Sequence, residues 1–189
     1  IRPTTRGSTC PKSVLLALPI AAALLAFPLL VRAPQATIVR VDPAAILDGD
    51  GASWDSASND LQIALERSPS GSVFWCAKGN YKKIRIVKPC EIYGGFDGNE
   101  ASLEERDWAA NRSVFSSVEI SSDALIDGVT FAFPPEGGEV SFNNADNPTL
   151  KNCRFSKTVS AGPAILSDGC SSPSLINCAL IDCRAGASR

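Results

Sequence analysis

Three stretches of the chain share one pattern of apolar and polar positions. The copies are ALIDGVTF, PTLKNCRF and PSLINCAL, which begin at Ala124, Pro148 and Pro173 and so lie 24 and 25 residues apart. In each, apolar residues alternate with polar ones on both sides of a Gly or Asn. Alternation is typical of a strand with one buried face, and Gly and Asn tolerate the backbone of a sharp bend. Each copy therefore predicts a strand, a bend and a second strand.

The repeats predict an all-β fold, a right-handed parallel β-helix. One copy cannot bury its own apolar face, whereas coils stacked ~4.8 Å apart can. We expect Ile126, Leu150 and Leu175 to be buried neighbours one coil apart. A leucine-rich repeat is the main competitor, but its consensus requires Leu where Pro148 and Pro173 stand.

The bend residues predict a polar ladder. Asn152 and Asn177 should lie one above the other, because a sharp bend exposes peptide groups that need partners. Gly128 should take the same bend one coil earlier without joining the ladder. The match also extends backwards, since Val140 precedes Ile165 by the same interval of 25 residues.

The segment before the repeats predicts a cap over the first coil. TIVRVD (37–42) alternates like a strand, and NDLQIALERS (59–68) has the pattern of a helix. Asn59 is the expected N-cap, with Gln62 completing a capping box. The expected apolar stripe of the helix consists of Leu61, Ala64 and Leu65. Further short strands are predicted at Val73–Ala77, Lys83–Val87, Cys90–Tyr93 and Ser117–Ile120.

Several of these stretches resemble a known group of proteins. DGASWDSASNDLQIAL, VFWCAKGNY, EIYGGFDGNEASLEERDWAANRSVFS and PTLKNCRFSKT are similar to right-handed parallel β-helix proteins of bacterial cell surfaces, including the family of the polymorphic outer-membrane proteins. The resemblance covers roughly residue 38 to the end. It implies an exported β-helix with an N-terminal helical cap. The chain has GPAI and FSKT where the polymorphic family has G-G-A-I and F-x-x-N.

The front of the chain has the pattern of an export signal. Residues 14–31 carry no charge and follow Arg2, Arg6 and Lys12. A basic start before an apolar run is typical of a signal peptide, and an uncleaved membrane anchor is the alternative. We therefore divide the chain into a signal peptide or anchor (1–36), a cap with the first coils (37–100), and further coils (101–189). The last coil is expected to be truncated.

Charge and composition exclude several classes of function. Four of the 18 basic residues and none of the 20 acidic ones lie in residues 1–33, which leaves the body mildly acidic and disfavours nucleic acid. The sequence contains no His, which excludes Ser-His-Asp chemistry within this chain. A membrane contact is expected only through the N-terminal segment.

Two acidic segments are candidate sites. Asp48, Asp50 and Asp55 could bind calcium, but their spacing differs from that of an EF-hand loop and fits an ordinary turn. A second segment could supply acid and base for glycan cleavage, although we favour a solvated acidic turn. Its carboxylates are Glu100, Glu104, Glu105 and Asp107.

The positions predicted to face outward beside the repeats form neither a carboxylate column nor an aromatic platform. They are Asp127, Lys151, Ile176, Thr130, Arg154 and Ala179. We predict packing of the cap rather than sugar stacking for the three tryptophans, Trp54, Trp75 and Trp108. No catalytic, cofactor-binding or metal-binding residue is therefore assigned from the sequence.

Cysteine usage leaves the disulfide state open. Without Cys10, which a cleaved signal would remove, six cysteines remain: Cys76, Cys90, Cys153, Cys170, Cys178 and Cys183. Six in an exported chain suggests disulfides. However, Cys153 and Cys178 share a column with Val129, so we favour a reduced, buried stack for this pair.

Together these patterns predict an exported, non-catalytic surface or secreted scaffold, adhesive or glycan-binding, with an extracellular polysaccharide or a cell-surface ligand as partner. The alternative is the N-terminal part of a polysaccharide lyase or glycoside hydrolase. No cofactor is expected.

Overall fold

The computed structural model describes residues 36–134, 138–157, 163–170 and 172–181. The elements in chain order are β1 (Ile38–Val41), α1 (Leu61–Arg67), β2 (Ser72–Ala77), β3 (Gly79–Tyr81), β4 (Ile84–Ile86), β5 (Cys90–Phe96), the 3-10 helix η1 (Leu103–Glu105), β6 (Ser113–Phe115), β7 (Val118–Ile120), β8 (Ala124–Asp127), β9 (Thr130–Phe133), β10 (Val140–Asn143), β11 (Thr149–Lys151), β12 (Arg154–Lys157), β13 (Ile165–Asp168), β14 (Ser174–Ile176) and β15 (Ala179–Ile181). The predicted signal peptide or anchor lies outside the described residues, except for residue 36.

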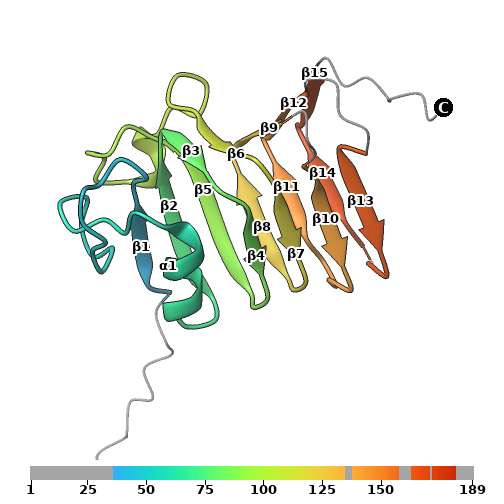
Figure 1. Ribbon diagram of the computed structural model, residues 1–189, viewed down its shortest axis with the longest axis horizontal. Coiled ribbons are helices and arrows are strands. Elements are labelled where there is room, and N and C mark those ends of the chain that lie inside the picture. The colour runs from blue at the N-terminus through green and yellow to red at the C-terminus, as the bar shows by residue number, and fades with distance from the viewer. Residues whose placement is uncertain (1–35, 135–137, 158–162, 171, 182–189) are drawn as a thin grey trace, which may run out of the picture. The chain divides into compact units, whose positions relative to one another are not determined.

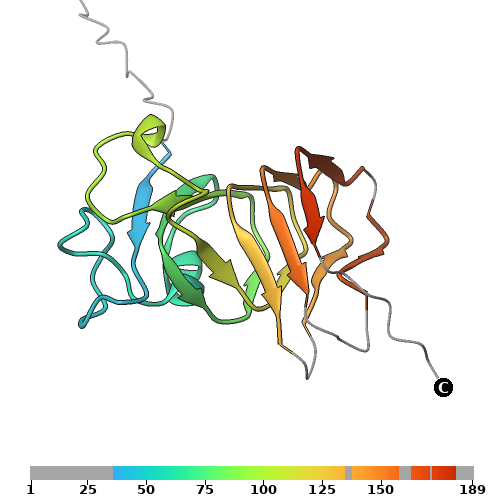
Figure 2. The same ribbon diagram turned by 90° about the horizontal axis from the view of Figure 1, so that it is seen from above.

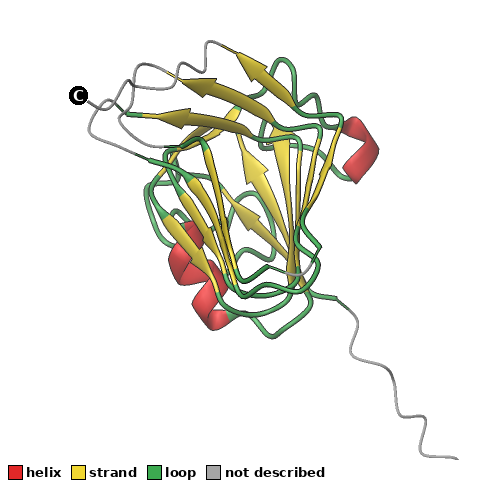
Figure 3. Cartoon of the chain, turned by 90° about the vertical axis from the view of Figure 1, so that its right-hand side faces the viewer, coloured by secondary structure: helices red, strands yellow, loops and turns green. Residues whose placement is uncertain are grey.

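The strands form three parallel sheets, as the repeats predict (Figure 1). Sheet A has the order β1-β2-β5-β8-β11-β14, sheet B the order β15-β12-β9-β6-β3, and sheet C the order β13-β10-β7-β4. Successive coils add one strand to each sheet, so strands from neighbouring coils lie side by side (Figure 2). Along the stack, the three sheets are walls around a common interior (Figure 3). The parallel β-helix is confirmed, and its right-handedness stays a prediction.

The predicted column of apolar residues is paired in register. Leu150 lies opposite Ile126 on one side and Leu175 on the other. Ile126 and Leu150 are fully buried, whereas Leu175 is 43% exposed in the last described coil. The neighbours are thus as predicted, but burial of Leu175 is not, because the structure describes no further coil that covers it. Val140 and Ile165 are also paired, as their spacing indicates.

Aromatic side chains fill the interior beside sheet B. Phe115 is paired with Phe131, and Phe131 with Phe155. The rings of Phe131 and Phe155 stack with their centroids 4.9 Å apart. All three are at most 1% exposed. Stacking like residues on successive coils therefore gives the interior a continuous aromatic column, an arrangement favourable beyond the buried area itself.

The bends have the backbone that the sequence predicts. Asn152 and Asn177 have φ values of 51° and 52°, and Gly128 has 74°. The Asn177 Nδ2 donates to Asn152 Oδ1 at 2.7 Å, which confirms the ladder. Gly128 takes the bend one coil earlier without a side chain. The ladder nevertheless continues there, because Asn152 Nδ2 donates to Asp127 Oδ1 at 2.8 Å.

The predicted helix α1 takes the place of a strand beside β4. Its apolar stripe of Leu61, Ala64 and Leu65 is buried in the common core. The Gln62 side chain accepts a hydrogen bond from the backbone N–H of Arg85 in β4, at 2.8 Å. This bond satisfies a donor on the open edge of sheet C, so the helix closes that edge as the sequence predicts.

The predicted N-cap of α1 is wrong by one residue. Asp60, not Asn59, has the extended backbone of a cap, and its side chain accepts from the N–H groups of Gln62 and Ile63. Asn59 instead lies one position too early and donates to Ala45 O at 3.4 Å. The Gln62 side-chain oxygen accepts from Arg85 N of β4 instead, so the expected capping box does not form.

The outer edge of β1 is covered by the loop 48–58. Arg40 N donates to Gly51 O at 2.9 Å, and Ser58 N donates to Arg40 O at 3.0 Å. Trp54 secures this loop, because its Nε1 donates to Glu100 O at 2.9 Å and its ring lies against Phe96. The first coil is therefore closed at sheet A by a loop and at sheet C by a helix.

Candidate functional site

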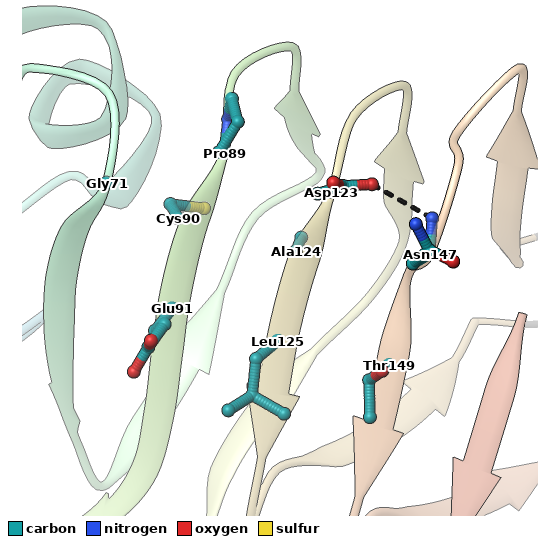
Figure 4. A pocket seen from close by; sticks show the side chains of 9 residues that line it. All are labelled: Gly71, Pro89, Cys90, Glu91, Asp123, Ala124, Leu125, Asn147 and Thr149. Atoms are coloured by element: carbon teal, nitrogen blue, oxygen red, sulfur yellow. Dashed lines mark hydrogen bonds between the residues drawn. The ribbon is translucent and has the colours of Figure 1, made fainter.

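A shallow groove crosses the outer face of sheet A at the starts of three neighbouring strands, β5, β8 and β11 (Figure 4). We call it the sheet A groove. Its volume is about 370 Å³, and its lining consists of Gly71, Pro89, Cys90, Glu91, Asp123, Ala124, Leu125, Asn147 and Thr149. It crosses successive coils because the same outward position recurs on each of them.

The centre of the groove is apolar and its margins are polar. Leu125 is paired in register with Glu91 on one side and with Thr149 on the other, so these three outward side chains form one row. At the strand starts, the Asp123 carboxylate accepts a hydrogen bond from Asn147 N at 2.9 Å (Figure 4). The groove thus offers carboxylate, hydroxyl and amide groups around an aliphatic floor.

A second outward row lies two residues further along the same strands. It consists of Tyr93, Asp127 and Lys151, paired in register. Tyr93 joins the two rows, because its hydroxyl donates to Glu91 Oε2 at 2.7 Å. Partial burial and the neighbouring Glu91 carboxylate raise the pKa of Tyr93 well above its usual value. Tyr93 is therefore a neutral phenol whose hydroxyl donates to the Glu91 carboxylate and holds it in place.

Asp127 lies on the outer face, as predicted, but its side chain is buried there. It is only 3% exposed. Arg106, from the loop between β5 and β6, covers it, with Nη2 3.1 Å from Asp127 Oδ1. The same guanidinium lies over the Tyr93 ring, 5.2 Å from its centroid. The alternation places Asp127 on the outer face correctly, but it cannot indicate that a distant loop covers that face.

The acidic loop before β6 is also more structured than predicted. Glu100 is 7% exposed rather than solvated. Its carboxylate accepts hydrogen bonds from the N–H groups of Asp97, Gly98 and Asn99. Burial acts to raise the pKa of Glu100, but these donors outweigh it and hold the pKa below its usual value. Glu100 is therefore the internal clamp of this loop.

The other three carboxylates of that segment, Glu104, Glu105 and Asp107, are exposed. Glu105 and Asp107 accept bonds from nearby backbone N–H groups. They fit the solvated acidic turn that the sequence favours.

The three predicted calcium candidates lie in the loop that covers β1. Asp48 accepts from Ser58 Oγ at 2.7 Å and forms an ion pair with Arg67. Asp50 accepts from Ala52 N and Ser56 Oγ. Both are thus engaged in holding the loop, and Asp55 is exposed. Within the described part of the chain, no three His, Cys, Asp or Glu residues are grouped as metal ligands would be.

The tryptophans mostly pack, as expected. Trp75 is 5% exposed and stacks on Phe96 with centroids 4.8 Å apart. Trp54 lies against the same ring. Trp108, by contrast, is 42% exposed.

The five cysteines that the structure describes are free, and Cys183 lies outside the described residues. Cys153 is buried, as the sequence predicts, and Cys178 is half-buried against the core. Cys76 and Cys90 are buried.

Searches against known proteins give no assignment: no family model, no curated protein and no solved structure matches the chain. Across the residues that the structure describes, none of the helices has the length and apolar character needed to span a bilayer.

Proposed function

We propose that the chain is an exported, non-catalytic β-helix scaffold of the cell surface or secreted fraction, and that it binds a glycan in the sheet A groove. The observation that carries this proposal is the row of Glu91, Leu125 and Thr149 across three coils, with Asp123 and Asn147 at its margin. An apolar floor suits the C–H face of a sugar ring, and the polar margin suits its hydroxyl groups.

The charge of the groove narrows the class of glycan. Glu91 and Asp123 are exposed carboxylates in its lining. Both would repel a polyanionic chain such as a uronic acid polymer. A neutral polysaccharide fits better, because its hydroxyl groups can donate to the two carboxylates. Elongated chains are favoured over single sugars, since the groove continues across coils.

The binding test uses immobilised neutral and acidic polysaccharides. The full chain should be retained by a neutral one. Leu125→Arg, which places a long charged side chain in the middle of the groove, should abolish retention. Ala132→Arg is the matched control, because Ala132 is likewise half-buried on the outer face of its strand, but in sheet B. Equal retention of both variants would refute the groove as the binding site, and retention by no polysaccharide would refute glycan binding.

The export proposal rests on the basic residues and the apolar run of residues 1–36. Residues 1–36 fused to a periplasmic reporter should carry it out of the cytoplasm. A reporter that stays in the cytoplasm would contradict export. An exported but membrane-bound reporter would favour the uncleaved anchor over the cleaved signal.

A second candidate function is that of the N-terminal part of a polysaccharide lyase or glycoside hydrolase. The observation in its favour is that Glu91 and Asp123 line the same groove, as the paired carboxylates of a glycosidase do. Release of new chain ends by the full chain, lost in Glu91→Gln and retained in Asp55→Asn, would favour this function over simple binding.

A further inference from the structure

Cys153 and Cys178 are placed one directly above the other on neighbouring coils. The residues on either side of them are paired in register, Lys151 with Ile176 and Arg154 with Ala179. Ala179 N also donates to Cys153 O at 2.9 Å, which ties the two coils together beside the thiols. Parallel neighbours lie ~4.8 Å apart, which is within the ~4.4–6.8 Å between Cα atoms that a disulfide spans.

The two thiols differ in access to solvent. Cys153 is 2% exposed, and its Sγ donates to Lys151 O at 3.2 Å. Cys178 is half-buried in the last described coil, and its Sγ lies 3.5 Å from Ile176 O. The Cys153 thiol beside it lowers the pKa of Cys178, and the same contact, together with burial, raises the pKa of Cys153. One accessible nucleophile thus lies beside one buried partner.

Two other described cysteines, Cys76 and Cys90, lack this arrangement. Cys76 is paired in register with Gly94, and Cys90 with Ser72. Both are buried, and burial raises the pKa of Cys90 to about 12. Thiol reactivity requires access and thiolate character, so these two residues are expected to be inert under conditions in which Cys178 reacts.

We propose that Cys153 and Cys178 form a disulfide-forming site, oxidised by a small-molecule disulfide such as oxidised glutathione. The Cys178 thiolate attacks one sulfur of the oxidant and releases one molecule of thiol, leaving a mixed disulfide. The Cys153 thiol gives its proton to water and attacks the Cys178 sulfur, which releases the second thiol. Two protein thiols are oxidised, and one disulfide of the oxidant is reduced.

The product links the last described coil of the stack to the coil before it. The last described coil contains only the short strands β13, β14 and β15. Its apolar residues Leu175 and Leu180 are 43% and 58% exposed. A covalent bond between the coils limits separation of β14 and β15 from β11 and β12. The site therefore stabilises a coil whose apolar residues are only partly buried.

The test compares reduced chain with chain treated with oxidised glutathione, using peptide mapping and thermal unfolding. Mapping should show a peptide cross-link between Cys153 and Cys178, with Cys76 and Cys90 still free. The cross-link should survive in the Cys170→Ser, Cys183→Ser double variant. Oxidation should raise the Tm of this double variant but not that of Cys178→Ser, which changes only a half-buried side chain.

Three results would overturn the proposal: an unchanged number of free thiols, a persistent mixed disulfide at Cys178 without cross-linking, or a bond from Cys178 to Cys170 or Cys183 instead. Because the double variant keeps both proposed partners, a folding defect of Cys178→Ser leaves the mapping result decisive. The glycan-binding proposal is tested separately, because neither Cys153 nor Cys178 lines the groove.

Discussion

The first and the last described coils of the stack differ in how their strand edges and apolar side chains are covered. At the first coil, a loop bonds to the outer edge of β1, and Gln62 of α1 accepts from the edge of β4. At the last coil, Leu175 and Leu180 belong to inward-facing columns and yet remain about half exposed. We call the first of these the closed end.

Two equivalent leucines show how much of the burial of a side chain depends on the neighbouring coils. Leu150 and Leu175 have the same residue type, the same strand position and the same register. Only Leu150 has described coils on both sides, and only Leu150 is fully buried. Burial in a solenoid is therefore a property of stacking and not of one repeat.

The largest expected effect concerns the apolar column. Leu150→Ala should lower the free energy of unfolding by about 3 kcal/mol, because it removes a fully buried side chain and leaves a cavity. Leu175→Ala should cost about 1 kcal/mol, since roughly half of that side chain is already in water. Urea denaturation of both variants measures the difference. Equal costs would mean that Leu175 is buried in solution and that the last described coil is covered.

The Asn ladder should show the same asymmetry. Asn152→Leu should cost about 2 kcal/mol, because it removes the donor to Asp127 and the acceptor for Asn177, and Asp127 is buried. Asn177→Leu, at an exposed position, should cost less, about 1 kcal/mol, most of it from placing Leu at a φ of 52°. Asn152→Gly keeps the bend and serves as the control for backbone strain. Thermal melts in which Asn152→Leu is as stable as wild type would contradict the ladder.

The clamp of the loop at the closed end gives a pH-dependent prediction. Glu100→Gln should cost about 1.5 kcal/mol at pH 7, because the carboxylate accepts three backbone hydrogen bonds. Its pKa is lower in the folded chain than the ordinary value of 4.5. The carboxylate therefore stabilises the fold above pH 4.5, and this contribution is lost as the pH falls through the lower, folded pKa.

Urea denaturation at several pH values tests this clamp. The difference between wild type and Glu100→Gln should shrink below pH 4.5. Glu104→Gln, on an exposed residue of the same loop, is the matched control and should have little effect at any pH. A difference for Glu100→Gln that is independent of pH would contradict a charged clamp.

The smallest predicted effect concerns the cap of α1. Asp60→Ala should lower the free energy of unfolding by about 1 kcal/mol, since its side chain accepts from two N–H groups of the first turn. Asn59→Ala should change it by no more than about 0.5 kcal/mol. The reverse ranking in chemical denaturation would restore Asn59 as the cap.

Much of the fold could be predicted because each coil repeats the same local rule. The columns through Leu150 and Asn152 follow from residue spacing, and the strands follow from alternation. β3 and β6 were not predicted, since GNY and SVF are too short to show a period. The predicted N-cap of α1 is one residue too early because Asn59 and Asp60 are both good capping residues. Only the backbone conformation, extended at Asp60, distinguishes them.

Most of the candidate site could not be predicted from the sequence, because contacts between distant segments create it. Asp127 and Arg106 are 21 residues apart, and no pattern relates the loop of Arg106 to the outer face of β8. The sheet A groove likewise combines Glu91, Leu125 and Thr149 from three coils. The register of the columns, extended upstream to β5, is the signal that could have found this row.

Backbone amide hydrogen exchange along the chain tests the central claim most directly, namely a parallel β-helix whose first described coil is covered and whose last described coil is partly exposed. In the reduced full chain, amides of β1, β2, β5 and β8 should exchange slowly, because each strand is paired or covered on both edges. Amides of β14 and β15, with a described neighbour on one edge only, should exchange much faster. Protection in β14 equal to that in β8, or exchange in β1 as fast as in β14, would contradict the account.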